Sequence, residues 1–221
     1  MIITLASQKG GVGKSTVAMA LTAELYDRGF KVLLADCDWQ CTALTWREVG
    51  DENQVDGPAV MHFGQGFHHP DQIPTQAQIY DFIILDTPGR SGDVQRLAMG
   101  LSDLVLLPCG PTSADAWALA DTIAELNKGR LINPNLIARI LISKADGRTN
   151  LGKSAGEIFS NLDVASMENR LSYLTAFQEF PATGKGLVAF TGKSHKAARE
   201  LIKLTDEILD TLNIKEGRRA A

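Results

Sequence analysis

The chain has 221 residues, with 44% hydrophobic and 22% charged side chains and a formal net charge of −4. This length and composition suffice for one buried core, so we expect a single domain over residues 1–221 that folds without disulfides or a structural metal. The net negative charge excludes a protein that is basic over its whole surface. Three scattered cysteines and the lack of a long apolar run indicate a reducing, cytoplasmic location and no membrane.

The first predicted elements enclose a glycine-rich loop. Residues 2–6 form a short apolar run typical of a buried strand, and residues 14–27 have helical spacing. Between them, residues 9–16 read KGGVGKST. A strand, a glycine-rich loop and a helix in this order predict a phosphate-binding loop.

Each residue type in this loop suits contact with a phosphate chain. Its glycines let successive backbone N–H groups curl around phosphate oxygens without a Cβ clash. The ammonium of Lys14 can reach the β and γ phosphates, and the hydroxyl of Ser15 can ligate Mg²⁺. The predicted nucleotide-binding residues of the loop are therefore Gly10, Gly11, Val12, Gly13, Lys14, Ser15 and Thr16.

The rest of the chain alternates apolar runs with helical or irregular stretches. The runs lack polar alternation, as strands do when helices cover both faces of a parallel sheet. We therefore predict an α/β fold with a doubly wound, mostly parallel sheet that binds its ligand at the carboxyl ends of the strands. The predicted strands span 31–36, 82–86, 104–108 and 137–143, a helix lies near 113–127, and 50–78 forms loops around a short edge strand near 59–63.

The phosphate loop departs from the general pattern G-x-x-x-x-G-K-[ST], because Gln8 stands where the first glycine belongs. In the form KGGxGK[ST] it resembles the deviant Walker A motif of the ParA/MinD family of P-loop ATPases, and most closely that of the small ParA-type partition proteins. This resemblance implies a P-loop NTPase fold, ATP and Mg²⁺ as cofactors, and slow hydrolysis of ATP. It also implies that Lys9 reaches across a two-fold interface to the nucleotide of the partner subunit, within an ATP-dependent homodimer.

An acidic segment follows the second predicted strand. Residues 36–40 read DCDWQ and resemble the D-x-D-P-Q segment of the family. The resemblance implies that Asp38 orients the attacking water and that Asp36 holds Mg²⁺ through a water. Trp39 replaces the proline of that segment and does not fix the backbone as proline would. The alternative is that both acids simply cap a helix.

A second acidic segment ends the third long apolar run. Residues 83–89 read IILDTPG and resemble the Walker B strand with its switch loop. The resemblance implies that Asp86 faces the metal through a water. The alternative is an ordinary buried strand.

Late residues of the chain carry the predicted base and DNA contacts. By resemblance, Pro181 is expected near the adenine and Arg170 near DNA. Helical spacing predicts a last helix from Gly192 that packs an apolar stripe on the sheet. On its neighbouring face, spacings of three and four bring together basic residues that can grip DNA phosphates, although a solvated face would look the same; these are Lys196, Arg199 and Lys203.

Three functions compete. The favoured one is a nucleoid-associated, ParA-type ATPase that binds non-specific DNA and positions a plasmid, chromosome or other cargo with an adaptor or centromere-binding partner. A MinD-like, membrane-associated ATPase would need a terminal basic amphipathic helix with bulky apolar residues, whereas residues 215–221 read KEGRRAA. An iron–sulfur or other metal-handling relative would place paired cysteines at a subunit interface, a pattern that Cys37, Cys41 and Cys109 do not match.

Overall fold

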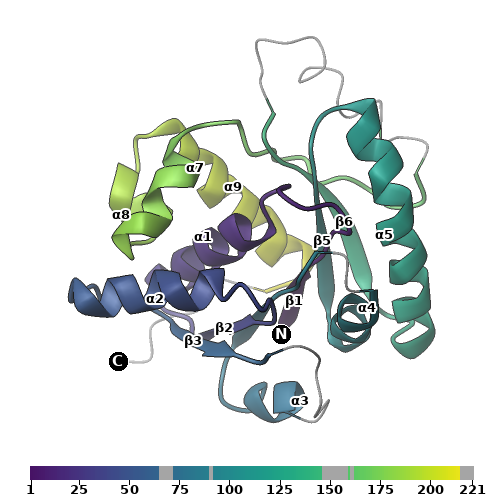
Figure 1. Cartoon of the computed structure of the whole chain (residues 1–221), viewed down its shortest axis with the longest axis horizontal. Coiled ribbons are helices and arrows are strands. Elements are labelled where there is room, and N and C mark those ends of the chain that lie inside the picture. Colours follow the sequence, from purple (N-terminus) through teal and green to yellow (C-terminus); the bar gives the residue numbers. More distant parts are fainter. Residues whose placement is uncertain (65–71, 90–91, 146–158, 160–161, 215–221) are drawn as a thin grey trace.

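The computed structural model describes residues 1–64, 72–89, 92–145, 159 and 162–214. Its centre is a six-stranded sheet in the order β3-β2-β4-β1-β5-β6, in which neighbouring strands pair in parallel. This arrangement confirms the predicted doubly wound α/β fold (Figure 1). The strands are β1 (Ile2–Leu5), β2 (Val32–Asp36), β3 (Ala59–His62), β4 (Phe82–Asp86), β5 (Leu104–Cys109) and β6 (Ile137–Ile142).

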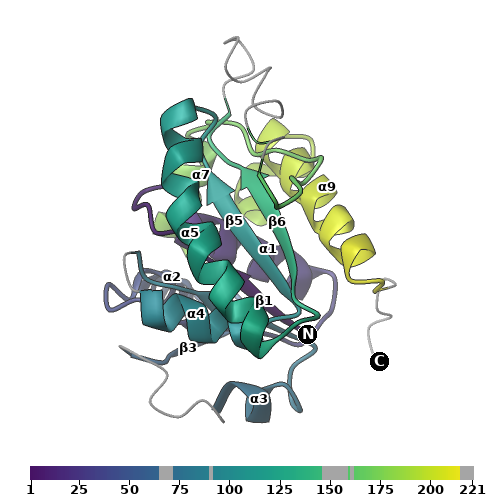
Figure 2. The same cartoon turned by 90° about the vertical axis from the view of Figure 1, so that its right-hand side faces the viewer.

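Helices cover both faces of the sheet. The first, second and last helices lie on one face together with two short ones, while α4 and α5 lie on the other (Figures 1 and 2). The described helices are α1 (Lys14–Asp27), α2 (Thr42–Glu52), α3 (Gln72–Gln76), α4 (Gly92–Leu101), α5 (Ser113–Ile132), α7 (Ala176–Glu179), the 3₁₀ helix η1 (Phe180–Thr183), α8 (Leu187–Thr191) and α9 (Lys196–Thr211).

Alternate residues of each strand supply two separate apolar layers. Leu34 and Ile84 point into the layer beneath α1 and α9, whereas Leu33 and Ile83 point into the layer beneath α4. Val105 belongs to a further apolar cluster beneath α5. Because both faces are buried, the strands read as continuous apolar runs, which is why they could be located from the sequence.

The predicted last helix begins later than expected. Gly192 has φ +80° and ends α8, so the prediction that it starts the last helix is wrong. The helix α9 starts at Lys196, and the Nδ1 atom of His195 accepts a hydrogen bond from the Ala197 backbone N–H at 3.1 Å. A histidine N-cap was not distinguishable from other exposed histidines by sequence pattern. Within the described ranges, no helix is both long and apolar enough to cross a bilayer.

Candidate nucleotide site

A cavity of about 750 Å³ opens at the carboxyl ends of the central strands, within the size range of small-ligand sites. The phosphate loop and the start of α1 line one side of it. The loop after β2 and the segment that precedes and begins α7 line the rest. The lining residues are Gly10–Val17, Asp38–Gln40, Gly89, Ser143, Lys144, Leu171–Leu174, Phe177 and Gln178.

The glycines of the phosphate loop take backbone conformations that other residues avoid. Gly11 has φ +74° and Gly13 has φ +97°, and Gly13 is the N-cap of α1. No side chain caps this helix, and its first turn contains no acidic residue. The free N–H groups and the positive end of the helix dipole therefore face the cavity, as a phosphate site requires.

Lys14 lines the cavity, and the buried Asp86 lies close enough to interact with its charge. Lys14 is buried, and desolvation lowers the pKa of its ammonium, although Asp86 and Asp38 act in the opposite direction. Gly89 of the switch loop lies over this lysine, since a Cβ placed on Gly89 would be 3.6 Å from Lys14 Nζ. A bound phosphate would supply a negatively charged partner for this buried ammonium.

Asp86 fits the role of a metal-facing carboxylate. It is fully buried, and neither carboxylate oxygen has a hydrogen-bond partner among the residues that the structure describes. Burial raises its pKa to about 7; Ser15 and Lys14 lie close enough to oppose the shift, but neither makes a hydrogen bond of normal geometry to it. An unpaired buried carboxylate beside Ser15 is the donor set that suits Mg²⁺ and its waters, so the residues present fit the cofactor.

Asp36 is largely occupied by the protein itself. Its Oδ2 accepts hydrogen bonds from the backbone N–H groups of Ala43 and Leu44 at 3.0 and 3.1 Å, and its Oδ1 accepts one from Asp38 at 3.1 Å. Asp36 therefore anchors the first turn of α2, which is the capping role weighed for it as an alternative. One lone pair of Oδ1 remains for an indirect contact with Mg²⁺, which stays a prediction.

Asp38 lies in a tight turn at the mouth of the cavity. Its Oδ1 accepts a hydrogen bond from the Gln40 N–H at 3.1 Å, and its carbonyl accepts one from the Cys41 N–H at 3.0 Å. These bonds fix the turn without a proline, while the side chain of Trp39 is 64% exposed and lines the cavity. The second oxygen of Asp38 is left to face a water, consistent with its predicted role.

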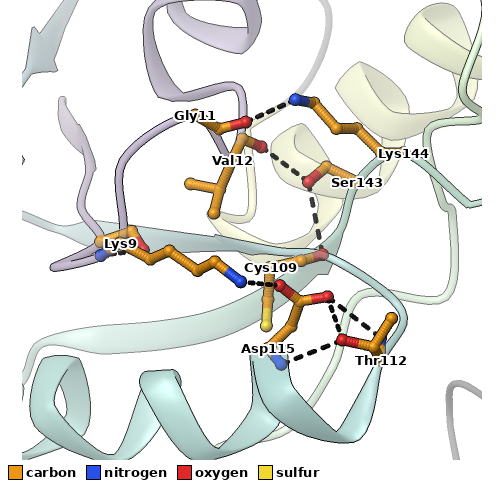
Figure 3. A network of polar contacts seen from close by, with 9 residues as sticks. Lys9, Gly11, Val12, Cys109, Thr112, Asp115, Ser143 and Lys144 are labelled. Atoms are coloured by element: carbon orange, nitrogen blue, oxygen red, sulfur yellow. Dashed lines mark hydrogen bonds and ion pairs between the residues drawn. The ribbon is translucent and has the colours of Figure 1, made fainter.

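Lys9 is held within its own subunit. Its Nζ lies 2.5 Å from Oδ1 of Asp115, near the start of α5 (Figure 3). Asp115 and Thr112 form a reciprocal capping box, which fixes the carboxylate. The hydrogen bond that Lys9 donates to Asp115 raises the pKa of Lys9. Burial raises the pKa of Asp115, but the same bond from Lys9 and those from Thr112 lower it overall.

Two residues after β6 brace the phosphate loop, although no sequence motif marked them. The Ser143 hydroxyl donates to the Val12 carbonyl at 2.8 Å, and the ammonium of Lys144 donates to the Gly11 carbonyl (Figure 3). Their position at the carboxyl end of a strand was the one available signal, because ligand sites gather at that edge.

Gln8, which stands where the general pattern has its first glycine, pairs with a second glutamine. The side-chain amide of Gln8 donates to Gln95 of α4 at 3.2 Å. The buried Gln95 in turn donates to the carbonyls of Ser7 and Pro88, at 3.0 and 2.6 Å. The side chain at position 8 therefore takes part in tying the entry of the phosphate loop to the switch loop after β4.

The far side of the cavity can receive a nucleoside. Since the phosphate loop takes the phosphates, the space beside Leu171–Leu174 and Phe177 remains for the ribose and base. Pro181, predicted to contact the adenine, lies in η1 and is not among the lining residues. The residues that line this side follow β6 by about 30 positions in the chain, so no strand-end motif marked them.

The predicted DNA contacts differ in exposure. Lys196, Arg199 and Lys203 are exposed on α9, where Lys196 Nζ lies 3.6 Å from Glu200 and Arg199 donates to the Ser194 carbonyl. Arg170 is half-buried and interacts with another part of the chain. The basic cluster on α9 therefore offers the more accessible charge. In the basic stretch 128–153, residues 146–153 lie outside the described residues.

Comparison with known proteins identifies a nucleotide-binding family. A family model described as the CobQ/CobB/MinD/ParA nucleotide binding domain matches residues 3–188. The maintenance of carboxysome distribution protein A of Halothiobacillus neapolitanus is 22% identical over 208 residues, which cover 94% of this chain and 95% of that protein. The chromosome-partitioning ATPase Soj of Thermus thermophilus is 32% identical over 182 residues, covering 68% of this chain and 72% of that protein. Among solved structures, the septum site-determining protein MinD of Pyrococcus horikoshii, complexed with Mg-ADP, shares the fold with a TM-score of 0.73 at 22% identity, with 96% of each chain covered.

Proposed function

Because this chain belongs to the CobQ/CobB/MinD/ParA nucleotide-binding family, we propose that it is a positioning ATPase that dimerises on ATP and then holds non-specific DNA. The coarser part of this statement follows from membership: the chain is an ATPase of the ParA/MinD type that uses ATP and Mg²⁺. Dimerisation, DNA as the track, and a cargo carried through an adaptor or centromere-binding partner are the parts that we add. Nucleoid association in the cytoplasm follows from them.

The single observation that carries the proposal is the partly exposed Lys9, which directly precedes the loop residues that line the nucleotide cavity. Its side chain is 42% exposed, and the described protein gives it one ion pair, with Asp115. Because its side chain is partly exposed, Lys9 can exchange Asp115 for a negatively charged group bound to a second copy of the chain. Two triphosphates brought face to face would attract such an ammonium strongly, because both lie in a desolvated interface.

DNA is the proposed track because the net charge of −4 leaves only local basic surfaces for a polyanion. On α9, Lys196, Arg199 and Lys203 are spaced by three and four residues and share one exposed face. A dimer would present this face twice, and its affinity for phosphates would not depend on base sequence. Arg170 stays in the proposed set, with a smaller expected contribution because it is half-buried.

Light scattering with Mg²⁺ tests the proposal directly. ATP should convert the monomer to a dimer, and ADP should not, because the charge of the γ phosphate draws Lys9 across. Lys9→Ala should stay monomeric with ATP while still binding it. A Lys9→Ala protein that dimerises as well as the wild type would exclude the sandwich arrangement. If the wild type dimerises but is not retained on non-specific DNA at low salt, the track is a protein or membrane surface instead.

A further inference from the structure

The segment 168–172, which ends in the base-side wall of the cavity, is clamped to helix α9. Glu207 accepts hydrogen bonds from the backbone N–H groups of Glu168 and Asn169, at 2.6 and 2.9 Å. Seven residues earlier on the helix, Glu200 accepts two from Ser172. The Ser172 N–H lies 2.8 Å from Oε2, and the Ser172 hydroxyl lies 2.6 Å from Oε1.

The same segment is attached to the sheet on its other side. Leu171 donates its N–H to the Ile142 carbonyl at 3.0 Å, and the Tyr173 N–H donates to the Ala145 carbonyl at 3.0 Å. Ala145 and Ser172 form an isolated parallel bridge. The wall therefore extends the sheet past the end of β6, and α9 fixes it from outside.

Leu171, Ser172, Tyr173 and Leu174 all line the cavity. Ser172 is the one whose side chain bonds to α9, and Glu200 holds both its N–H and its hydroxyl. The Glu200 carboxylate is only 19% exposed, so water competes only weakly for its hydrogen bonds to Ser172. Loss of this carboxylate would leave a half-buried N–H and hydroxyl without their acceptor and would free the wall to move.

We propose that Glu200 is a positioning residue of the nucleotide site, which acts through Ser172 to hold the wall that packs against the nucleoside. The proposal rests on nucleotide binding and not on dimerisation or DNA. Glu200 is not among the residues that line the cavity, so it acts on the ligand only through Ser172. Its effect should therefore depend on whether the ligand carries a nucleoside.

Equilibrium titration with ADP and with inorganic pyrophosphate, each with Mg²⁺, separates the wall from the phosphate loop. Neither ligand carries the γ phosphate expected to drive dimerisation, so failure of the proposed dimer or DNA binding cannot affect the result. Glu200→Ala should weaken ADP about tenfold and pyrophosphate by less than about twofold. Glu200→Gln, which keeps one carbonyl acceptor for Ser172, should recover part of the ADP affinity.

Two further variants keep the test decisive. Asp210→Ala, at an exposed acid of α9, should leave both affinities unchanged. Ser172→Ala removes only the hydroxyl bond to Glu200 and should weaken ADP about threefold, which gives a result even if Glu200→Ala does not fold. Equal losses for ADP and pyrophosphate in the Glu200 variants, or unchanged ADP affinity, would overturn the proposal.

Discussion

The Nζ atom of Lys9 lies 2.5 Å from Oδ1 of Asp115, on an α5 helix that follows it by more than a hundred residues. In the single subunit, this ion pair attaches the beginning of the phosphate loop to the first turn of α5. In the proposed dimer, Lys9 must leave this carboxylate before it can reach a second nucleotide. The ion pair is therefore part of the energy difference between monomer and dimer.

Asp115→Asn should make dimerisation easier. Asparagine can still accept the Thr112 N–H bond of the capping box, but it no longer holds Lys9 by charge. Because Lys9 is partly exposed, the gain should be modest, with half-maximal dimerisation at roughly two- to fivefold less protein. Light scattering over a protein titration at saturating ATP measures it. Asp121→Asn, an exposed change on the same helix, is the control, and an unchanged midpoint in Asp115→Asn would show that the pair does not restrain Lys9.

Asp38→Ala should bind ATP and dimerise but hydrolyse it at least roughly a hundredfold more slowly, since the carboxylate serves the water and not the nucleotide. Single-turnover hydrolysis measures the chemical step. Asp38→Asn separates charge from shape, because asparagine can still accept the Gln40 N–H bond that closes the turn. If Asp38→Asn hydrolyses ATP normally, the role of Asp38 is to shape the turn.

Asp86→Asn should stabilise the nucleotide-free protein at pH 8. It should also abolish the increase in ATP affinity that Mg²⁺ produces. Burial raises the pKa of Asp86 from 3.8 to about 7, so between these values the folded protein binds a proton that the unfolded chain has lost. The wild type therefore loses stability as pH rises from 3.8 to about 7 and levels off above it, whereas the variant does not. The variant should gain roughly 1 to 3 kcal/mol in free energy of unfolding at pH 8 and much less at pH 5. Urea unfolding at both values checks this; a gain equal at pH 5 and pH 8 would contradict it.

Substituting Arg199 and Lys203 with Gln should flatten the salt dependence of DNA retention. The two changes remove about four phosphate contacts per dimer, which lowers the slope of log affinity against log salt by roughly 3 to 4 units if all four contacts form. Lys31→Gln, at an exposed lysine just before β2, serves as the control. A slope that responds to Lys128→Gln instead would move the DNA site to the basic stretch that begins there.

The parts that the sequence predicted are those with strong local patterns. The β4 strand matches its predicted limits of 82 and 86, because an apolar run buried on both faces has clear ends. The phosphate loop was located because a glycine-rich loop between a strand and a helix, followed by lysine and serine, is a specific pattern. No sequence pattern predicted the helix α2, in which only Ala43, Trp46, Arg47 and Gly50 are buried.

The parts that it missed depend on contacts between distant segments. Asp115 meets Lys9 across more than a hundred residues, and Glu200 meets Ser172 across 28. Nothing in the spacing around these acids marks them, because exposed helices commonly carry Asp and Glu. The base contact was likewise expected at Pro181, because Pro181 lies in a stretch that resembles the family. Resemblance of a stretch did not show which of its residues would reach the cavity.

The attachment of α9 to the nucleotide cavity also bears on the order in which the protein matures. During synthesis, the phosphate loop leaves the ribosome long before residues 196–211, so a nascent chain can fold its early strands while Glu200 and Glu207 are still missing. Such a chain has a phosphate cradle with an unsupported wall and should release nucleotide quickly. Firm retention of nucleotide is therefore expected only after the α9 helix has docked on this wall.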